Sequence, residues 1–418
     1  MTEAEVAIEA LGSAGDGIAT LDGRSLFVPG ALPGERWRVR LDAGGRATPL
    51  ACLAPAPRAA PPCPVFGRCG GCRLQHLTAA DYAAFKRRRI VDALARQGLP
   101  GEVVAEARIG PPASRRRLRL ALTRPDGRLR LGLRERAGHA VVPLDHCPVA
   151  APELAALLPV LGAALQPWLS RPRPTEASLT LTDAGPDLLL HAARPPTAEE
   201  RVGAALLAGS TGLARIAWQA DGPPEALLTL RAPAVRLSGV AVEVPPGAFL
   251  QASAFGEAEL ARAVTDWAGE PRQAADLFAG LGTLTFALAD RARQVLACES
   301  DPLAAAALRR AAGGRGVTVA ERDLASRPLQ PTELTHDLVV LDPPRAGAQA
   351  QCAALARSRV PRVIYCSCHP ESFARDARLL THAGFALEEV RPIDQFLWSA
   401  EVELAARFVR AGARTNRP

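Results

Sequence analysis

The carboxyl-terminal part of the chain, residues 249–418, alternates short apolar segments with helical ones, and this alternation restricts the fold more than any other feature. The expected strands are centred on Ala275–Phe278, Val295–Cys298, Val317–Ala320, Leu338–Leu341 and Val363–Tyr365. Helical segments such as Pro302–Ala312 lie between them. Strands separated by helices favour a parallel sheet, because a parallel pair needs a long crossover connection. We therefore predict an α/β, Rossmann-like domain with a doubly wound sheet.

The predicted strands end in residues suited to binding a small molecule at one edge of the sheet. The first strand runs into Asp276–Gly282 (DLFAGLG), whose glycines let a ligand approach the backbone. Acids end the next three strands, at Glu299, Asp323 and Asp342, and an acid after the second strand can bind ribose hydroxyls. An NAD site is the alternative, but residue 285 is Thr where the dinucleotide pattern has its last glycine.

Two further motifs lie at the same edge of the sheet, and a third lies near the end of the chain. Asp342–Gly347 (DPPRAG) follows the fourth strand, and Ile364–Pro370 (IYCSCHP) ends the fifth. The chain then carries an IDQF segment at 393–396 and an EVEL segment at 401–404. A thiol and a carboxylate at one edge suit nucleophilic and acid–base chemistry. Taken alone, Cys368 could equally be a buried structural thiol at a strand end.

Residues 1–58 have an all-β pattern. The dipeptide Asp22-Gly23 predicts a hairpin, and Arg36–Leu41 (RWRVRL) alternates cationic and apolar residues. A Pro/Ala-rich linker follows at Ala54–Pro62. The stretch resembles a TRAM domain, an OB-like RNA-binding barrel, most specifically at Val28–Glu35 (VPGALPGE). A generic small barrel is the alternative.

The central region, residues 59–248, carries a predicted helix at Ala79–Gln97 and then becomes mostly β. Around a Pro-Asp-Gly turn, two predicted strands alternate leucine with arginine, at Arg115, Arg117, Arg119, Arg128, Arg130 and Arg134. The net charge of +7 also favours a polyanionic partner. We interpret these arginines as an RNA-contacting face, with a solvated outer face as the alternative; Lys86 is the only lysine.

Four cysteines, Cys63, Cys69, Cys72 and Cys147, have the spacing of a metal or cluster site. Four thiolates suit an iron–sulfur cluster and also tetrahedral zinc. The chain opens with neither a basic start nor an apolar run, so we expect a cytoplasmic, reducing location and no membrane association. We also expect a monomer, and three domains with bounds 1–58, 59–248 and 249–418.

Across essentially all of its length, the chain resembles the RNA uracil carbon-5 (m5U) methyltransferase family. The family's D-P-[AP]-R-A-G loop matches Asp342–Gly347, and its S-C-N-P motif matches Ser367–Pro370, with Cys368 as nucleophile. The base that follows its D-x-F motif matches Glu403, and its F-x-Q-V-N stretch matches Phe249–Ser253. The chain departs from the family where His369 replaces Asn and where an Ala-Ser pair replaces V-N.

The resemblance implies two cofactors. S-adenosylmethionine would be bound by Gln251, Phe278, Gly280, Glu299, Asp323 and Asp342. A [4Fe–4S] cluster, as in the ribosomal-RNA branch of the family, would be held by Cys63, Cys69, Cys72 and Cys147. The RNA partner implied by that branch is large-subunit (23S) ribosomal RNA.

The implied chemistry is methylation of uracil at carbon 5. Cys368 adds to carbon 6 and makes carbon 5 nucleophilic, and Glu403 removes the carbon-5 proton after methyl transfer. Gln251 and Phe249 would hold the flipped base, and Arg345 would help the thiol to ionise. Glu401 is a rival for the role of base. The alternatives to this function are a non-catalytic RNA-binding iron–sulfur protein and a cytosine carbon-5 RNA methyltransferase.

Overall fold

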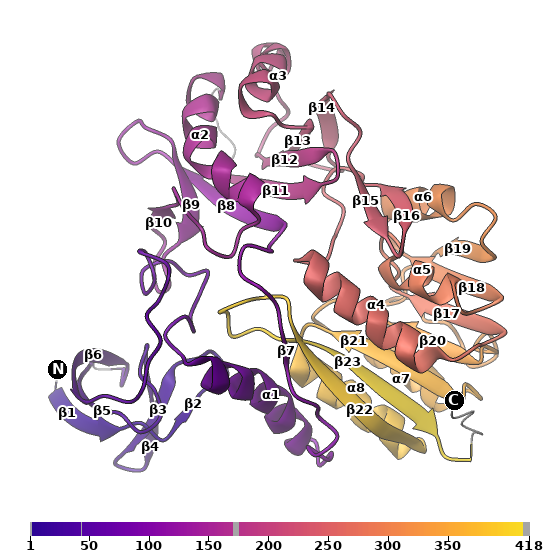
Figure 1. Cartoon of the computed structure of the whole chain (residues 1–418), viewed down its shortest axis with the longest axis horizontal. Coiled ribbons are helices and arrows are strands. Elements are labelled where there is room, and N and C mark those ends of the chain that lie inside the picture. Colours follow the sequence, from indigo (N-terminus) through magenta and orange to yellow (C-terminus); the bar gives the residue numbers. More distant parts are fainter. Residues whose placement is uncertain (1, 43, 170–174, 413–418) are drawn as a thin grey trace.

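The computed structural model describes residues 2–42, 44–169 and 175–412. Figure 1 shows three parts: a small β-structure at the amino end, a sheet with two helices in the middle of the chain, and an α/β part at the carboxyl end. The long helix α1 (Ala79–Ala95) lies between the first and the third part.

The amino-terminal part is built from two three-stranded sheets. They comprise β1 (Thr2–Ala7), β5 (Arg36–Leu41) and β6 (Ala47–Ala54), and β2 (Ala10–Leu11), β3 (Gly17–Leu21) and β4 (Arg24–Val28). Asp22 and Gly23 join β3 to β4 with φ of 49° and 73°, as a type I′ hairpin turn requires. In the VPGALPGE segment, the buried Glu35 carboxylate accepts hydrogen bonds from Trp37 Nε1 at 2.7 Å and from Arg58 Nε at 2.7 Å. This carboxylate therefore ties the barrel to the linker that follows it.

The arginines of β5 lie on one face of the strand, as their alternation predicts, but each is paired with an acid of β1. Strand β1 places Glu5 opposite Arg38 and Glu3 opposite Arg40, and these pairs are 3.3 Å and 3.2 Å apart. Arg36 also reaches Glu5, at 3.4 Å. Exposed ion pairs contribute only about 0–1 kcal/mol, so phosphate groups can still compete for these arginines.

The central part is a seven-stranded sheet with strand order β10-β9-β8-β11-β12-β13-β14. Its strands are β8 (Arg117–Thr123), β9 (Arg130–Arg134), β10 (Val141–Pro143), β11 (Glu176–Thr182), β12 (Gly185–His191), β13 (Arg215–Gln219) and β14 (Glu225–Thr229). Helices α2 (Pro152–Trp168) and α3 (Ala198–Thr211) pack on each other and on the sheet. The helix α2 buries Leu154, Leu157, Leu158, Leu161 and Leu165, which form one face. In the described part of the chain, no helix is long and apolar enough to cross a membrane.

The arginine row that begins at Arg115 is not a free cationic strip either. Arg119 is ion-paired with Glu176, and the Arg117 guanidinium lies 4.8 Å from the centre of the Phe249 ring. Arg115 lines a pocket among the cysteines. Only part of the predicted face therefore remains open to a polyanion, because neighbouring acids and rings engage the cations.

The carboxyl-terminal part is an eight-stranded sheet with order β19-β18-β17-β20-β21-β23-β22-β7. Its strands are β7 (Arg108–Ile109), β17 (Gln273–Leu277), β18 (Gln294–Glu299), β19 (Val317–Glu321), β20 (Leu338–Leu341), β21 (Arg362–Ser367), β22 (Phe385–Asp394) and β23 (Glu403–Arg410). The five predicted strands, β17 to β21, run parallel. Strand β23 is antiparallel to both of its neighbours, so the sheet is mixed and not purely parallel.

Helices cover both faces of this sheet (Figure 1). They are α4 (Ala254–Ala268), α5 (Thr283–Ala289), α6 (Pro302–Ala311), α7 (Gln349–Ala356) and α8 (Pro370–His382). Alternate residues of β17 enter two cores: Ala274 packs with α4 and α5, whereas Ala275 packs with α7 and α8. A hairpin of β15 (Ala234–Leu237) and β16 (Val240–Glu243) packs against α5 and α6.

The helix α1 belongs to the second of these cores, although it lies in the segment that we assigned to the central region. Ile90 and Leu94 are buried together with residues of α7 and α8. The short strand β7 also pairs with the end of β22. The chain therefore enters the carboxyl-terminal core once before it builds the central sheet.

Candidate active site

The loop after β17 contains three residues with positive φ: Phe278 (68°), Gly280 (56°) and Gly282 (98°). A Cβ on Gly282 would lie 2.4 Å from Cδ1 of Leu308, so glycine allows α5 and α6 to pack closely. Beside Gly280 there is open space within 4 Å. Phe278 is a bulky residue in a strained conformation, which is typical of ligand sites. Of these residues, we predicted Phe278 and Gly280 as cofactor contacts.

Glu299, at the end of β18, fixes two loops at once. Its carboxylate accepts hydrogen bonds from the backbone N–H of Gly280 and of Asp301, both at 2.7 Å. The predicted contact Glu299 is therefore joined directly to the glycine loop, at the sheet edge where nucleosides bind in such folds.

Asp276 contributes a buried acid that our set of ligands omitted. One of its oxygens accepts a hydrogen bond from Thr285 Oγ1 at 2.5 Å, and the other is buried without a partner among the described residues. Burial, together with the charges of Asp342 and Glu299, raises the pKa of Asp276 to about 7. Three acids thus meet at adjacent strand ends, which suits a ligand that carries positive charge.

Asp323 lies two residues after β19 and is exposed. Its carboxylate accepts hydrogen bonds from the backbone N–H of Ala325 at 2.9 Å and from Ser326 Oγ at 2.7 Å. These bonds lower the pKa of Asp323. Asp323 is thus an ionised, accessible carboxylate on the third strand's loop, but it is not part of the buried group of acids.

Cys368 follows β21 directly and precedes α8, so it occupies a sharp strand-to-helix turn. Its side chain is partly exposed, whereas Cys366 is fully buried in the core. Burial raises the pKa of the Cys368 thiol to about 12; the charges of Glu403 and Asp342 add to this rise, and Arg345 opposes it. In the RNA-free protein the thiol is therefore protonated at neutral pH.

A chain of hydrogen bonds links the two acids beside this thiol. Gln251 Nε2 donates to Asp342 Oδ2 at 3.1 Å, and Gln395 Nε2 donates both to Gln251 Oε1 and to Glu403 Oε2, each at 2.7 Å. Burial raises the pKa values of Asp342 and Glu403, and their mutual repulsion further raises that of Glu403. A buried carboxyl of raised pKa is suited to proton transfer near neutral pH.

Glu403 and Glu401 lie in different environments, although they are only two residues apart. Glu403 begins β23, and its side chain is 2% exposed. Glu401 precedes the strand, and its side chain is 40% exposed and lies 3.2 Å from Arg345. The structure thus brings Glu403, and not Glu401, into the group that contains Asp342, Gln251 and Cys368.

His369, which stands where the family has Asn, caps the helix α8. Its Nδ1 accepts a hydrogen bond from the backbone N–H of Ser372 at 3.3 Å. Asparagine is also a strong helix N-cap, so the two side chains can play the same structural part. The His369 ring therefore holds the turn that presents Cys368.

The segment 249–253 is pinned by arginines of the central part. Arg117 Nη1 donates to the carbonyl of Leu250 at 2.6 Å, and Arg116 Nε donates to that of Gln251 at 2.9 Å. Phe249 is 63% exposed, which is unusual for its size, and Arg117 covers one face of its ring. An exposed ring at the rim of such a site offers a surface on which a base can stack.

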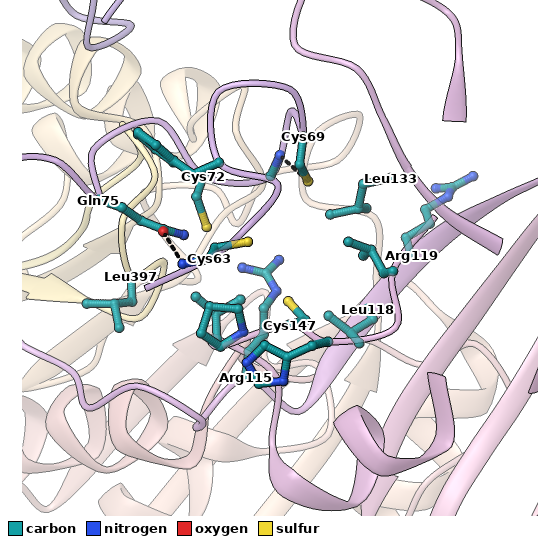
Figure 2. Close-up of a pocket in the computed structure, with 16 residues that line it drawn as sticks. Cys63, Cys69, Cys72, Gln75, Arg115, Leu118, Arg119, Leu133, Cys147 and Leu397 are labelled. Atoms are coloured by element: carbon teal, nitrogen blue, oxygen red, sulfur yellow. Dashed lines mark hydrogen bonds between the residues drawn. The ribbon is translucent and has the colours of Figure 1, made fainter. Parts of the chain in front are cut away.

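The four predicted metal-binding cysteines line one pocket of about 190 Å³ (Figure 2). Cys63, Cys69 and Cys72 come from the segment before α1, and Cys147 comes from the loop after β10. Gln75, Arg115, Arg119 and His146 also line it, and Gln75 Nε2 is buried without a partner among the described residues. As their side chains stand, no three His, Cys, Asp or Glu groups of the described residues lie close enough together to hold a single metal ion.

Sequence reasoning did not identify Gln395 as a functional residue, left Asp276 out of the set of cofactor contacts and assigned Arg115 to an RNA-contacting face. Gln395 lies next to the acid of the D-x-F match, but an amide on a strand end carries no signal of its own. Arg115 was interpreted as part of a surface row. Arg115 lies two residues before β8, and only the tertiary structure places its side chain in the pocket with the cysteines.

The sequence matches two family models. Residues 2–46 match the TRAM domain, and residues 325–410 match tRNA (Uracil-5-)-methyltransferase. The chain is similar in fold to the crystal structure of the Pyrococcus abyssi tRNA (uracil-54, C5)-methyltransferase in complex with S-adenosyl-L-homocysteine. The TM-score is 0.71 and the identity 23%, over 97% of this chain and 99% of the other.

Two relatives align along nearly the whole chain. A protein of Caulobacter vibrioides, named an uncharacterized RNA methyltransferase, is 40% identical over 97% of this chain and 100% of its own length. The 23S rRNA (uracil(1939)-C(5))-methyltransferase RlmD of Halomonas elongata is 34% identical over 96% of this chain and 88% of its own length. The chain therefore belongs to the family of S-adenosylmethionine-dependent RNA uracil-5-methyltransferases that carry a TRAM domain.

Proposed function

We propose that the chain methylates carbon 5 of one uridine in 23S ribosomal RNA through a covalent bond between Cys368 and carbon 6 of the uracil. The single observation that carries the mechanism is the grouping of Cys368 with the buried acids Asp342 and Glu403 at one edge of the sheet. Cys368 is the nucleophile, Asp342 is suited to holding the ring, and Glu403 has the raised pKa of a proton acceptor.

The residues act in sequence on the flipped base. The sulfur of Cys368, once deprotonated, bonds to carbon 6, and the ring electrons move toward carbon 5. Asp342 and Gln251, joined by a hydrogen bond, hold the ring edge. Arg345 lowers the pKa of the thiol and so favours the thiolate. After methyl transfer, Glu403 takes the carbon-5 proton, the carbon–sulfur bond breaks, and the free enzyme returns.

S-adenosylmethionine supplies the methyl group from a positively charged sulfonium. The site fits this cofactor because Asp276, Glu299 and Asp342 concentrate negative charge there, and because one buried oxygen of Asp276 lacks a partner among the described residues. Glu299 would hold the ribose. Gly280 would let the cofactor approach the backbone, and Gln251, Phe278 and Asp323 would complete the contacts.

The Glu299→Gln variant should bind S-adenosylmethionine about 10- to 100-fold more weakly, because it loses a charge-assisted hydrogen bond. Isothermal titration with the cofactor alone measures the change. Glu321→Gln is the matched control, since Glu321 is an exposed acid at the end of the neighbouring strand β19. Equal affinities for the wild-type and Glu299→Gln proteins would remove Glu299 from the binding site.

We propose a [4Fe–4S] cluster on Cys63, Cys69, Cys72 and Cys147. Burial raises the pKa of three of these thiols, so a bound cation is needed to hold them as thiolates. A single zinc ion needs its sulfurs at about 2.3 Å, and the described thiols are not gathered so closely. A pocket of about 190 Å³ suits a larger group. When bound, the cluster would join the segment before α1 to the central sheet.

Cys69→Ser should lose most of the bound iron and melt at a lower temperature, because a group that binds only the folded state stabilises it. Iron and sulfide analysis of protein purified without oxygen should give about four irons per wild-type chain. Cys52→Ser is the control, since Cys52 is exposed and lies outside the pocket. One zinc per chain, with no iron, would contradict the proposed cluster but would keep the four cysteines as a metal-binding site.

The choice of RNA rests on two observations. The Halomonas elongata relative is a 23S rRNA enzyme, and the four-cysteine set resembles the ribosomal-RNA branch. A polar cleft of about 450 Å³ beside His369 is lined by residues of the barrel, the cysteine segment and the methyltransferase part, including Arg73, Arg89 and Arg345. Such a cleft suits an RNA backbone near the target base.

We further propose that the protein acts as a monomer in the cytoplasm.

Mapping 5-methyluridine in 23S rRNA from cells with and without this protein tests the substrate. We expect one modified uridine to disappear in the deletion strain and to return when the wild-type gene is restored. An unchanged 23S rRNA, with a lost 5-methyluridine in transfer RNA, would redirect the proposal to transfer RNA.

A further inference from the structure

Lys86, the only lysine of the chain, lies in α1, and its side chain is 0% exposed. Its Nζ lies 2.9 Å from Asp394 Oδ1 and donates to the carbonyls of Phe396, at 3.4 Å, and Glu401. An ammonium group has three N–H donors, and all three have acceptors here. All of these acceptors belong to one short segment, residues 394–401.

This segment connects β22 to β23 and lies directly before the proposed base. It begins at the end of β22, includes Gln395 and leads directly into Glu403. Gln395 donates hydrogen bonds to Glu403 and to Gln251. Its position therefore sets the position of the proposed base, Glu403, relative to Gln251, which is proposed to hold the ring. A shift of the segment would therefore move the base relative to the uracil.

The segment is irregular and needs support from outside. Trp398 has φ of 59°, which is strained for a bulky residue. Its backbone N–H donates to Tyr82 Oη at 2.6 Å, and Tyr82 Oη donates to Asp394 Oδ2 at 2.5 Å. Tyr82 and Lys86 lie one helical turn apart on α1, so one face of this helix holds the whole segment.

We propose that Lys86 is a positioning residue for methyl transfer, which fixes the segment 394–401 and thereby sets Gln395 and Glu403 against the target ring. The proposal rests on the proposed role of Glu403 as base. Stability alone does not require a lysine here, because well-packed apolar residues often replace a buried ion pair without loss. Two backbone carbonyls of an irregular segment, together with a carboxylate, do require a donor that points in three directions.

The test uses the full-length double variant Lys86→Met/Asp394→Asn, which leaves no unpaired buried charge. We expect a folded protein with a moderately lower melting temperature, because two carbonyls lose their donor. The KM for RNA should be unchanged within about 3-fold and kcat lowered about 100-fold, as a misplaced catalytic group predicts. Unmodified substrate RNA should also accumulate as a denaturation-stable protein–RNA adduct, because proton removal becomes slow. A purely structural role would produce no such adduct.

Two further variants make the outcome decisive. Arg88→Met removes an exposed cation of the same helix and should leave kcat and the adduct level unchanged. If the double variant fails to fold, Tyr82→Phe replaces it, with an expected loss in kcat of about 10-fold and the same adduct. A folded variant with wild-type kcat, or one with low kcat and no adduct, overturns the proposal. If Glu403→Gln also forms no adduct, it is the base assignment that fails.

Discussion

Cys368→Ala should lose methyl transfer to RNA by more than about 10⁴-fold, because no other group can make carbon 5 nucleophilic. With RNA that carries 5-fluorouracil at the target, the wild-type protein should form an adduct that survives denaturation. Fluorine replaces the carbon-5 hydrogen, so there is no proton for the base to remove and the carbon–sulfur bond cannot break. Cys368→Ala should form none. Gel shift under denaturing conditions and transfer of a labelled methyl group measure the two effects.

The matched control for this prediction is Cys366→Ala, because Cys366 lies on β21, two residues before Cys368, but is fully buried in the core. It should keep the adduct and most of the activity, with a modest loss of stability from the small cavity. If Cys368→Ala formed the 5-fluorouracil adduct and Cys366→Ala did not, the nucleophile would be misassigned. Binding of S-adenosylmethionine should be the same in both variants, which excludes misfolding as the cause.

Glu403→Gln should turn over about 10²- to 10⁴-fold more slowly, which is the usual contribution of a general base. The first covalent step and methyl transfer do not need this base, so unmodified RNA should remain attached to Cys368 and carry the new methyl group. Denaturing gels measure the adduct, and mass spectrometry of the digested adduct shows whether the methyl group is present.

The comparison variant is Glu401→Gln. Glu401 is partly exposed and paired with Arg345, so this change should cost far less in kcat and should trap no methylated adduct. The stability of Glu403→Gln should be close to that of the wild type, because the amide matches the protonated carboxyl in shape and keeps a partner in Gln395. If Glu403→Gln turned over at the wild-type rate while Glu401→Gln trapped the adduct, the two roles would be exchanged.

Much of the fold could be predicted from local patterns. The five parallel strands lie where the apolar segments are, and α1 and α6 lie within a few residues of their predicted bounds. Period-2 and period-3.6 patterns are local, so they survive without any knowledge of contacts. The antiparallel β23 could not be predicted in this way, because its direction depends on which strands it joins after a return of the chain.

The arginine rows illustrate the opposite case. Alternation correctly placed Arg38 on one face of β5 and Arg119 on one face of β8. It could not predict which acids of neighbouring strands would pair with them. Glu5 and Glu176 lie on other strands, and their distance from these arginines is set by strand register. A charge that looks free in the sequence is therefore neutralised in the folded protein.

The amino-acid sequence by itself determined the chemical groups of this protein and the sheet edge at which most of them gather, because the carboxyl ends of parallel strands share one edge. Tertiary structure alone decided that Glu403 is buried beside Asp342 while Glu401 is exposed, and that Lys86 supports the segment between β22 and β23. Both outcomes depend on contacts between residues distant in the sequence, such as Arg345 with Glu401 (separation 56) and Lys86 with Phe396 (separation 310), and no local pattern encodes such contacts.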